Sequence, residues 1–306
     1  MKKSMIALSV MALLGSGAAM AASPNVKGGT SSSAGVAVGS SNHIMFSGGN
    51  SGVALNGASS YIDLAGGPIK GSNTAIAARG NGTILKATDM GLPLPINVAQ
   101  VWKASATQGT SKFVINSVRQ ITTLSFAPQF GGLVIGQVAN ASGVPLAVGS
   151  GVYFGEWAPR AAGTPPSNST NLNMGSSDRT VWYVGDNATT NMPTLANATY
   201  NVIGIQGVGT ASDNLPTAPK LYGGTLTANY NGSNGTLTGS ITNGTSTVNF
   251  NPAGNETKFD STTNGKFTNQ TKTIEGQFYN NASALAGIYK GGTAASNVAF
   301  GGSRSN

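Results

Sequence analysis

The chain contains a single histidine, His43, which is the first side chain to consider for chemistry. An apolar run at 44–46 and a glycine pair at 48–49 follow it directly. One neutral imidazole beside apolar side chains is the combination with which proteins hold haem, with the nitrogen on the iron and the apolar groups against the porphyrin. A lone histidine is more often structural or simply exposed, so the pattern leaves both interpretations open.

Further side chains could complete such a site. Met45 and Phe46 adjoin the histidine, and they are candidates for the wall of the pocket. Met90 and Tyr153 are further candidates for the pocket, and Met45, Met90 or Tyr153 could be the second axial ligand of the iron. Tyr153 also begins an aromatic cluster that has an alternative interpretation as domain core.

Motifs of the common enzyme classes are missing from the sequence. It has no G-x-S-x-G elbow and no phosphate-binding P-loop, and one histidine allows at most one Ser-His pair. The nine acidic residues are dispersed, which gives little support to a metal hydrolase. Paired carboxylates for glycoside hydrolysis stay open among Asp63, Asp89 and Glu156, although their spacing does not favour them. We therefore expect a binding protein without catalytic residues, whose only metal is the iron of haem.

The first 21 residues have the features of a secretory signal peptide. Lys2 and Lys3 precede an apolar run at 5–14, and small residues lead to a cleavage site after Ala21. No later stretch approaches 18 apolar residues, so no transmembrane helix is predicted. The chain has no cysteine, which excludes disulfides and a lipid anchor on a lipobox cysteine. We expect a secreted protein that neither spans a membrane nor carries a lipid.

The composition is typical of a secreted protein built from short strands and many turns. Only 8% of the residues are charged, and 44 of the 306 are glycine. Apolar residues recur in alternating patches, which argues against a disordered chain. The formal charge is +8, but the lysines and arginines are scattered without a basic run, so nucleic acid is not an expected partner.

A stretch rich in Pro, Ser and Asn at 161–177 predicts a linker between two domains. We therefore divide the chain into a signal peptide at 1–21, a ligand-binding domain at 22–177 and a barrel domain at 178–306. The second domain contains Asn-Gly pairs beginning at Asn231, Asn234, Asn243 and Asn264, which are strong hairpin signals. Eight or nine short strands fit one small closed barrel filled by its own side chains. Ligand chemistry is therefore expected in the first domain.

The C-terminal residues predict how this barrel closes. Polar and apolar residues alternate over 273–280, as in a half-buried strand, and 280–283 predicts a turn. Short strands are predicted at 286–290 and 298–301. We expect the final strand to pair back, so that the barrel has no free edge.

This closing segment resembles that of a known family. Its pattern is similar to the end of the C-terminal eight-stranded barrel of bacterial transferrin-binding protein B and of other proteins exported by Slam outer-membrane translocators. The overall layout is most similar to the hemophilins, which are secreted haem-binding proteins. The residues that carry the pattern are Gly276, Phe278, Tyr279, Asn281, Ala282, Leu285, Ala286, Gly287, Tyr289, Ala299, Phe300, Gly301, Gly302 and Arg304.

The resemblance implies an all-β fold with a clamp-like, β-rich N-terminal domain and a C-terminal eight-stranded antiparallel β-barrel. It implies non-covalent binding of haem b in the clamp, with His43 as iron ligand. It also implies export by a Slam-type translocator across both membranes of a Gram-negative bacterium. Such a hemophore takes free haem, or haem from haemoglobin, and passes it to a TonB-dependent haem receptor.

A rival interpretation needs no cofactor. Transferrin-binding protein B uses similar architecture to hold a host glycoprotein, so the barrel here could present a surface to a host protein or host cell. A passive adhesin also fits the Asn-, Thr- and Gly-rich composition, but it predicts no defined pocket.

Overall fold

The computed structural model describes residues 25–43, 48–66, 83–90, 93, 95–122, 130–160, 171–207 and 221–305. Within these ranges the regular structure is β-strand, apart from two short 3-10 helices, η1 (Ala87–Met90) and η2 (Ala294–Ser296). The all-β fold class predicted from the sequence is confirmed. The described part of the chain contains no helix of the length and hydropathy needed to cross a membrane.

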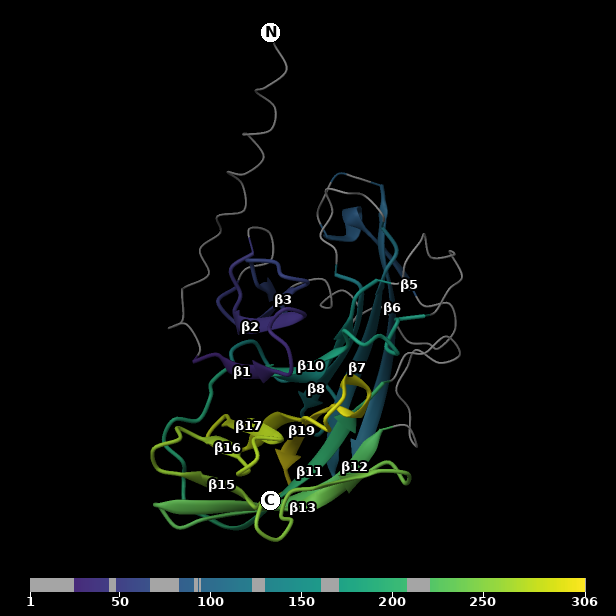
Figure 1. The fold of residues 1–306 in the computed structure, drawn as a ribbon. Helices are drawn as coiled ribbons and strands as arrows, with labels where there is room; N and C mark the ends of the chain where they lie inside the picture. Colours follow the sequence, from purple (N-terminus) through teal and green to yellow (C-terminus); the bar gives the residue numbers. More distant parts are fainter. Residues whose placement is uncertain are drawn as a thin grey trace.

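A seven-stranded antiparallel sheet, called the central sheet below, occupies the middle of the molecule (Figure 1). Its strands lie in the order β1-β10-β9-β8-β7-β6-β5. β6 and β7 form a long hairpin with ten paired positions. The bounds are β1 Lys27–Thr30, β5 Thr83–Lys86, β6 Asn97–Gln108, β7 Ser111–Gln120, β8 Gly132–Ala139, β9 Val152–Ala158 and β10 Thr180–Gly185.

The C-terminal strands form a closed eight-stranded antiparallel barrel. Its strands follow the order β11-β12-β13-β15-β16-β17-β18-β19, and β19 pairs with β11 to close the ring. β14 pairs with residues 240–242 of β13, beyond the part of that strand that pairs with β15. The bounds are β11 Leu195–Ile205, β12 Tyr222–Tyr230, β13 Asn234–Thr242, β14 Thr247–Asn249, β15 Thr257–Asp260, β16 Lys266–Thr268, β17 Ile274–Tyr279, β18 Ala284–Tyr289 and β19 Val298–Arg304.

Aromatic side chains fill the interior of the barrel. Phe278 lies at its centre, with its ring centroid 5.1 Å from that of Phe259, 5.3 Å from that of Phe267 and 5.7 Å from that of Tyr200. These contacts are edge-on or tilted, the geometry that aromatic quadrupoles favour. The prediction that the barrel is filled by its own side chains is confirmed, so a ligand has to bind elsewhere.

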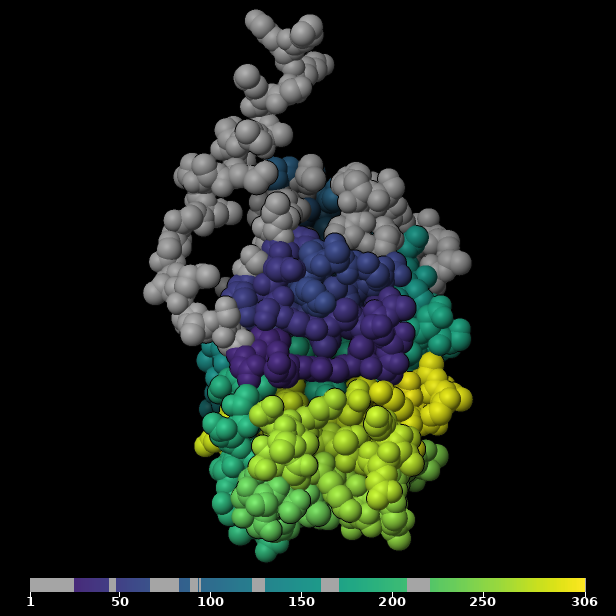
Figure 2. All heavy atoms as spheres, turned by 60° about the vertical axis from the view of Figure 1, so that its left-hand side comes forward, coloured from purple at the N-terminus to yellow at the C-terminus, as the bar shows by residue number. Residues whose placement is uncertain are grey.

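A small sheet of three strands covers the outer face of the central sheet. It consists of β2 (Val36–Ser40), β3 (Ser51–Leu55) and β4 (Ile62–Asp63) in that order. Figure 1 shows β2 and β3 in purple on the side of the central sheet away from the barrel, and Figure 2 shows the same purple residues directly above the green and yellow barrel. The molecule therefore has three layers: small sheet, central sheet and barrel.

The central sheet is buried on both faces, and successive residues of its strands serve different layers. On β8, Leu133 and Ile135 face the small sheet, whereas Val134 and Val138 pack toward the barrel. This is the alternation of side chains that a β-strand dictates. Because both faces of the sheet are covered, β8 and β9 are buried along their full length and neither strand has a solvent-exposed polar face.

Glycines form the contact between the central sheet and the barrel. A Cβ added at Gly136 of β8 or at Gly301 of β19 would overlap the Phe154 ring, and one at Gly185 would overlap the Tyr279 ring. Phe154 and Tyr279 are fully buried in the cluster that joins the two layers. Gly301 therefore belongs to the closing pattern because an aromatic ring occupies the space of its missing side chain.

The predicted turn after β17 is confirmed. Asn280, Asn281 and Ala282 have φ values of 53°, 55° and 59°, which is the left-handed region that asparagine tolerates better than most residues. The hydroxyl of Tyr200 donates to the Ala282 carbonyl at 2.6 Å, and the Ala282 amide donates to Thr189 Oγ1 at 3.0 Å. These bonds fix the turn against β11 and the segment before it.

The strand that follows the predicted domain boundary at 177–178 belongs to the central sheet. β10 pairs with β9 from Thr180↔Trp157 to Gly185↔Val152, and β1 lies along its other edge. The barrel strands begin only at Leu195. Alternation in the sequence predicts that β10 is a strand, but it does not determine which neighbour the strand pairs with. Residues 161–170 of the predicted linker lie outside the described residues.

A buried ion pair joins the central sheet to the barrel at one end of β9 and β10. Arg179 Nε donates to Glu156 Oε2 at 2.6 Å, and neither side chain has solvent exposure. Arg179 also donates to the carbonyls of Ala294 and Asn297 in the β18–β19 connection. Glu156 Oε2 accepts a further bond from the Gly207 amide at 2.8 Å. The pair therefore ties the central sheet to two segments of the barrel.

A buried carboxylate ties the small sheet to the opposite end of the same strands. Asp186 Oδ1 accepts from the amide and hydroxyl of Ser51 at 2.6 and 2.8 Å. Its Oδ2 accepts from the amides of Gly149 and Gly151, each at 3.2 Å. Burial nevertheless raises the pKa of Asp186, because the loss of hydration outweighs these four donors.

We expect the stability difference between the wild type and Asp186→Asn to depend on pH. Between the unfolded pKa of about 3.9 and the raised folded pKa, the folded state binds more protons than the unfolded chain. The free energy of unfolding of the wild type therefore falls, relative to the variant, as the pH rises through this window. Urea unfolding at several pH values measures the difference. A difference that stays constant or increases with pH contradicts the expectation.

Candidate ligand-binding site

His43 follows β2, and backbone hydrogen bonds hold it beside the segment that leads into β4. The amides of His43 and Asn42 both donate to the Tyr61 carbonyl at 3.0 Å, and the Tyr61 amide donates to Asn42 Oδ1 at 2.7 Å. His43 is half-buried. The small sheet therefore fixes the backbone at the histidine while leaving the side chain accessible.

A cavity of about 380 Å³ lies against His43. Its other walls come from the turn after β3, from Ile62 of β4 and from Phe130 before β8. The volume is within the range of about 300–1,000 Å³ that is common for small-molecule sites. His43 is thus one wall of a hollow of ligand size.

A second, smaller cavity of about 70 Å³ lies behind the first, between the small sheet and the central sheet. The two cavities share Leu55, Ile62 and Phe130, so these three side chains separate them. The lining of the second cavity is aliphatic or aromatic apart from Asp63. The cavity shows that the two sheets are incompletely packed here, and such empty volume costs stability.

The polar group in the lining of the apolar cavity is already engaged. Asp63 Oδ1 accepts from the amides of Ala65 and Gly66 at 2.7 and 2.9 Å, and its Oδ2 accepts from Asn50 Nδ2 at 3.3 Å. Because these donors face the carboxylate, it does not require a ligand to satisfy it. The cavity therefore favours an apolar occupant.

Phe130 is positioned by the core beneath it. Trp157 Nε1 donates to the Phe130 carbonyl at 2.8 Å, and the Gly131 amide donates to Gln120 Oε1 at 2.8 Å. Gly131 has a φ of 63°, and a side chain there would overlap the Ala158 carbonyl. These constraints turn the chain so that Phe130 lies at the wall between the two cavities.

The structure places the residues predicted from the sequence in different ways. His43 lines the larger cavity. Met45 and Phe46 lie outside the described residues, as does the side chain of Met90, whose backbone ends η1. Tyr153 is buried on β9 under the small sheet and lines neither cavity. Burial raises the pKa of Tyr153, so its hydroxyl stays protonated at neutral pH.

Sequence reasoning missed Leu55, Ile62 and Phe130. Leu55 ends a strand that is buried throughout, and such a run is a detectable signal for a core position. Nothing local indicates that it lies beside Phe130, which is 75 positions further along the chain. The contact depends on the small sheet lying over β8, which is a non-local property.

The cavity beside His43 offers one imidazole and an apolar wall. His43 supplies one imidazole, and the described residues contain no group of three or more His, Asp or Glu side chains arranged to hold a metal ion. A porphyrin supplies four nitrogen ligands and a large apolar surface. One imidazole and the apolar wall formed by Leu55, Ile62 and Phe130 fit those two properties.

No protein-family model matches the chain. Among solved structures, the vaccine antigen transferrin-binding protein B of Actinobacillus pleuropneumoniae matches over 90% of this chain and 98% of its own, with 12% identity and a TM-score of 0.35. A surface lipoprotein matches with the same coverage and identity and a TM-score of 0.34. Intact transferrin-binding protein B with both lobes matches over 75% of this chain and 43% of its own, with 14% identity and a TM-score of 0.23.

Proposed function

We propose that this protein is a secreted haem-binding protein, a hemophore, which holds haem b non-covalently in the cavity beside His43, called the haem cleft below. The observation that supports the proposal is the apolar wall of Leu55, Ile62 and Phe130. The cavity lined by His43 lies on one side of this wall, and the smaller apolar cavity lies on the other. When bound, haem supplies an iron atom with an axial position that a histidine nitrogen can take.

The residues of the cleft would divide the work of binding between them. Leu55, Ile62 and Phe130 would contact the porphyrin, and burial of apolar surface contributes about 25 cal/mol per Å². His43 would bind the iron and so fix the orientation of the ligand. The backbone bonds between the His43 segment and Tyr61 keep the backbone that carries the imidazole in place, which lowers the entropy lost on binding.

The export and delivery steps of the proposal rest on the signal peptide and on the closing pattern of the barrel. A Slam-type translocator would recognise the barrel during passage across the outer membrane. Outside the cell the protein would take free haem or haem from haemoglobin and pass it to a TonB-dependent receptor. The barrel is filled by side chains and the cleft lies in the other half, so export and haem binding use separate surfaces.

A haem titration followed by Soret absorbance tests the proposal. We expect a saturable band in the wild type and at least a ~100-fold weaker Kd in His43→Ala, which corresponds to about 2.7 kcal/mol. Ile62→Ala should weaken binding by about tenfold through lost apolar contact. Ile84→Ala is the matched control, because it is also a half-buried strand isoleucine but lines neither cavity.

The outcomes of this titration separate the possible errors. A wild type without a saturable band rejects haem binding altogether. A band that His43→Ala leaves unchanged moves the iron ligand to another side chain. Equal effects of the two isoleucine variants would place the ligand outside the cleft.

One exposed feature favours a second candidate function, the binding of a host protein. Val144 and Val148 lie in the connection between β8 and β9 with 55% and 67% of their surface exposed. Neighbouring exposed apolar side chains can supply the apolar part of a protein interface. Surface plasmon resonance on immobilised transferrin and haemoglobin checks this function. If the protein binds one of them through this loop, binding should be saturable and the double variant Val144→Ser/Val148→Ser should abolish it. If the wild type binds neither protein, both are excluded as partners.

A further inference from the structure

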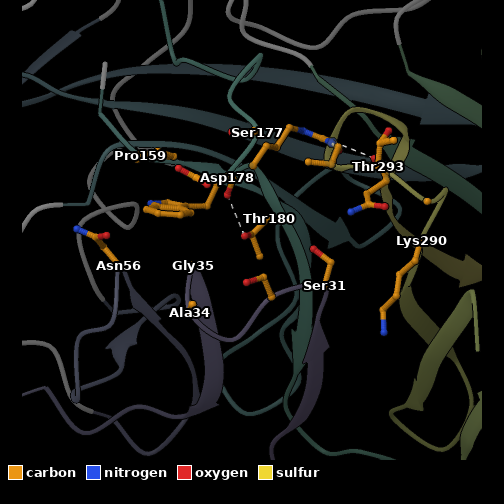
Figure 3. Close-up of a pocket in the computed structure, with 16 residues that line it drawn as sticks. Ser31, Ala34, Gly35, Asn56, Pro159, Ser177, Asp178, Thr180, Lys290 and Thr293 are labelled. Atoms are coloured by element: carbon orange, nitrogen blue, oxygen red, sulfur yellow. Dashed lines mark hydrogen bonds between the residues drawn. The ribbon is translucent and has the colours of Figure 1, made fainter. Parts of the chain in front are cut away.

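A third cavity, of about 490 Å³, lies where the three layers of the molecule meet. The small-sheet side contributes the turn at 31–35 and Asn56, the central sheet contributes the end of β9 and the start of β10, and the barrel contributes the β18–β19 connection. Figure 3 shows Ser177 and Asp178 on one side of this cavity, Ala34 and Gly35 on the opposite side, and Lys290 with Thr293 toward the barrel.

The lining of this junction cavity differs in kind from that of the haem cleft. Seven of its sixteen lining residues carry a hydroxyl or amide side chain, and its apolar part comes from Ala34, Pro159, Ala294 and Trp157, which is only 3% exposed. The polar side chains that line it are Ser31, Ser32, Asn56, Ser177, Asp178, Arg179, Thr180, Lys290, Thr293 and Asn297. Many short donors and acceptors beside an apolar surface suit a ligand that carries several hydroxyl groups.

The two cations that line the junction cavity are each paired with a carboxylate, which disfavours an anionic ligand. Arg179 is paired with Glu156 and also donates to two carbonyls. Lys290 Nζ lies 3.3 Å from Glu275 Oε1. Asp178 adds an exposed carboxylate at the mouth. An anionic ligand would meet cations that already have partners, together with this carboxylate.

Buried hydrogen bonds make the base of the cavity rigid. Thr180 Oγ1 donates to the Asp178 carbonyl at 3.2 Å, and the Gly291 amide donates to Asn297 Oδ1 at 3.0 Å. Arg179 Nη2 donates to the Asn297 carbonyl at 3.0 Å. Thr180, Asn297 and Arg179 are all buried. A ligand would therefore find its partners already in place, and less entropy would be lost on binding.

We propose that the junction cavity is a second binding site, for a neutral sugar of one or two rings. The Asp178 carboxylate accepts hydrogen bonds from adjacent sugar hydroxyls, and the serine, threonine and asparagine side chains of the rim satisfy the remaining ones. Asn56 lines both this cavity and the one beside His43, so the two sites adjoin.

Saturation-transfer NMR with a panel of neutral sugars tests this proposal. The panel is glucose, galactose, N-acetylglucosamine, N-acetylgalactosamine and lactose, each titrated against the full mature chain. We expect at least one saturable signal with a Kd on the order of 1 mM, the range for a small ligand in an open site. Asp178→Ala should weaken that Kd by about tenfold or more, because it removes a charged acceptor.

Two substitutions by tryptophan complete the design. Ala34→Trp puts a large side chain into the exposed rim and should abolish binding, whereas Ser233→Trp, on an exposed barrel turn, should leave the Kd unchanged. Circular dichroism confirms that each variant is folded, and Asp178→Ala provides an independent result if Ala34→Trp is not. The proposal is overturned if no sugar in the panel saturates, or if a saturable signal survives both Asp178→Ala and Ala34→Trp.

Discussion

Replacement of Arg179 by methionine is expected to lower the free energy of unfolding by about 3–5 kcal/mol. The substitution leaves the Glu156 carboxylate buried without its bond to Arg179. An ionised carboxylate that loses its cation partner is strongly disfavoured in a protein interior. It also removes the bonds from Arg179 to the carbonyls of Ala294 and Asn297, so the barrel loses a tether to the central sheet.

A double-mutant cycle in urea unfolding separates these effects. The double variant Glu156→Gln/Arg179→Met should recover a large part of the loss, because the buried charge is gone. Lys290→Met is the matched control for removal of a cation, since its pair with Glu275 is partly exposed and is expected to contribute about 0–1 kcal/mol. A loss below about 1 kcal/mol in Arg179→Met would show that the pair is not buried as described.

Phe154→Ala is expected to destabilise the protein by about 3–5 kcal/mol. The ring is fully buried between the central sheet and the barrel, in the space left by Gly136 and Gly301. It also contacts Phe113 edge-on, with ring centroids 6.5 Å apart at 85°. Its loss leaves a cavity between two sheets whose backbones cannot easily move together, so relaxation recovers little.

The coupling between Phe154 and Gly301 makes this prediction specific. Gly301→Ala should destabilise the wild type, because the added methyl group overlaps the phenylalanine ring. In the Phe154→Ala background the same substitution should cost much less, since the methyl group then occupies the vacated space. Urea unfolding of the two single variants and the double variant measures the coupling. Strictly additive effects would mean that the ring and the glycine do not meet.

The sequence predicts the barrel well because its signals are local. The Asn-Gly pairs that begin at Asn231, Asn243 and Asn264 lie between paired strands as predicted, whereas Asn234-Gly235 lies within β13, so that hairpin prediction is wrong. Alternation over 273–280 predicts the strand β17. The closing turn is likewise indicated by Asn280 and Asn281, which tolerate positive φ better than most residues. The role of Gly301 is different, because the ring that requires it is Phe154, which lies in another layer.

The site is less predictable because its parts come together only in the tertiary structure. His43 is conspicuous in the sequence because it is the single histidine. The other wall of its cavity is formed in part by Leu55 of β3 and by Phe130 before β8, which the sequence does not place beside it. β10 shows the same limit, since its pairing with β9 places it in the central sheet after a predicted boundary. Periodicity reports that a segment is a strand, whereas its neighbours follow from the packing of whole layers.

The most direct test of the proposed haem site is imidazole rescue of His43→Gly. Haem is titrated into the wild type, His43→Gly, and His43→Gly in the presence of free imidazole, and the Soret band is followed. If His43 binds the iron in the cleft, the variant should lose affinity, and free imidazole should restore both the band position and the Kd toward the wild-type values. A variant that binds haem as the wild type does, or one whose loss imidazole does not reverse, would contradict this role of His43.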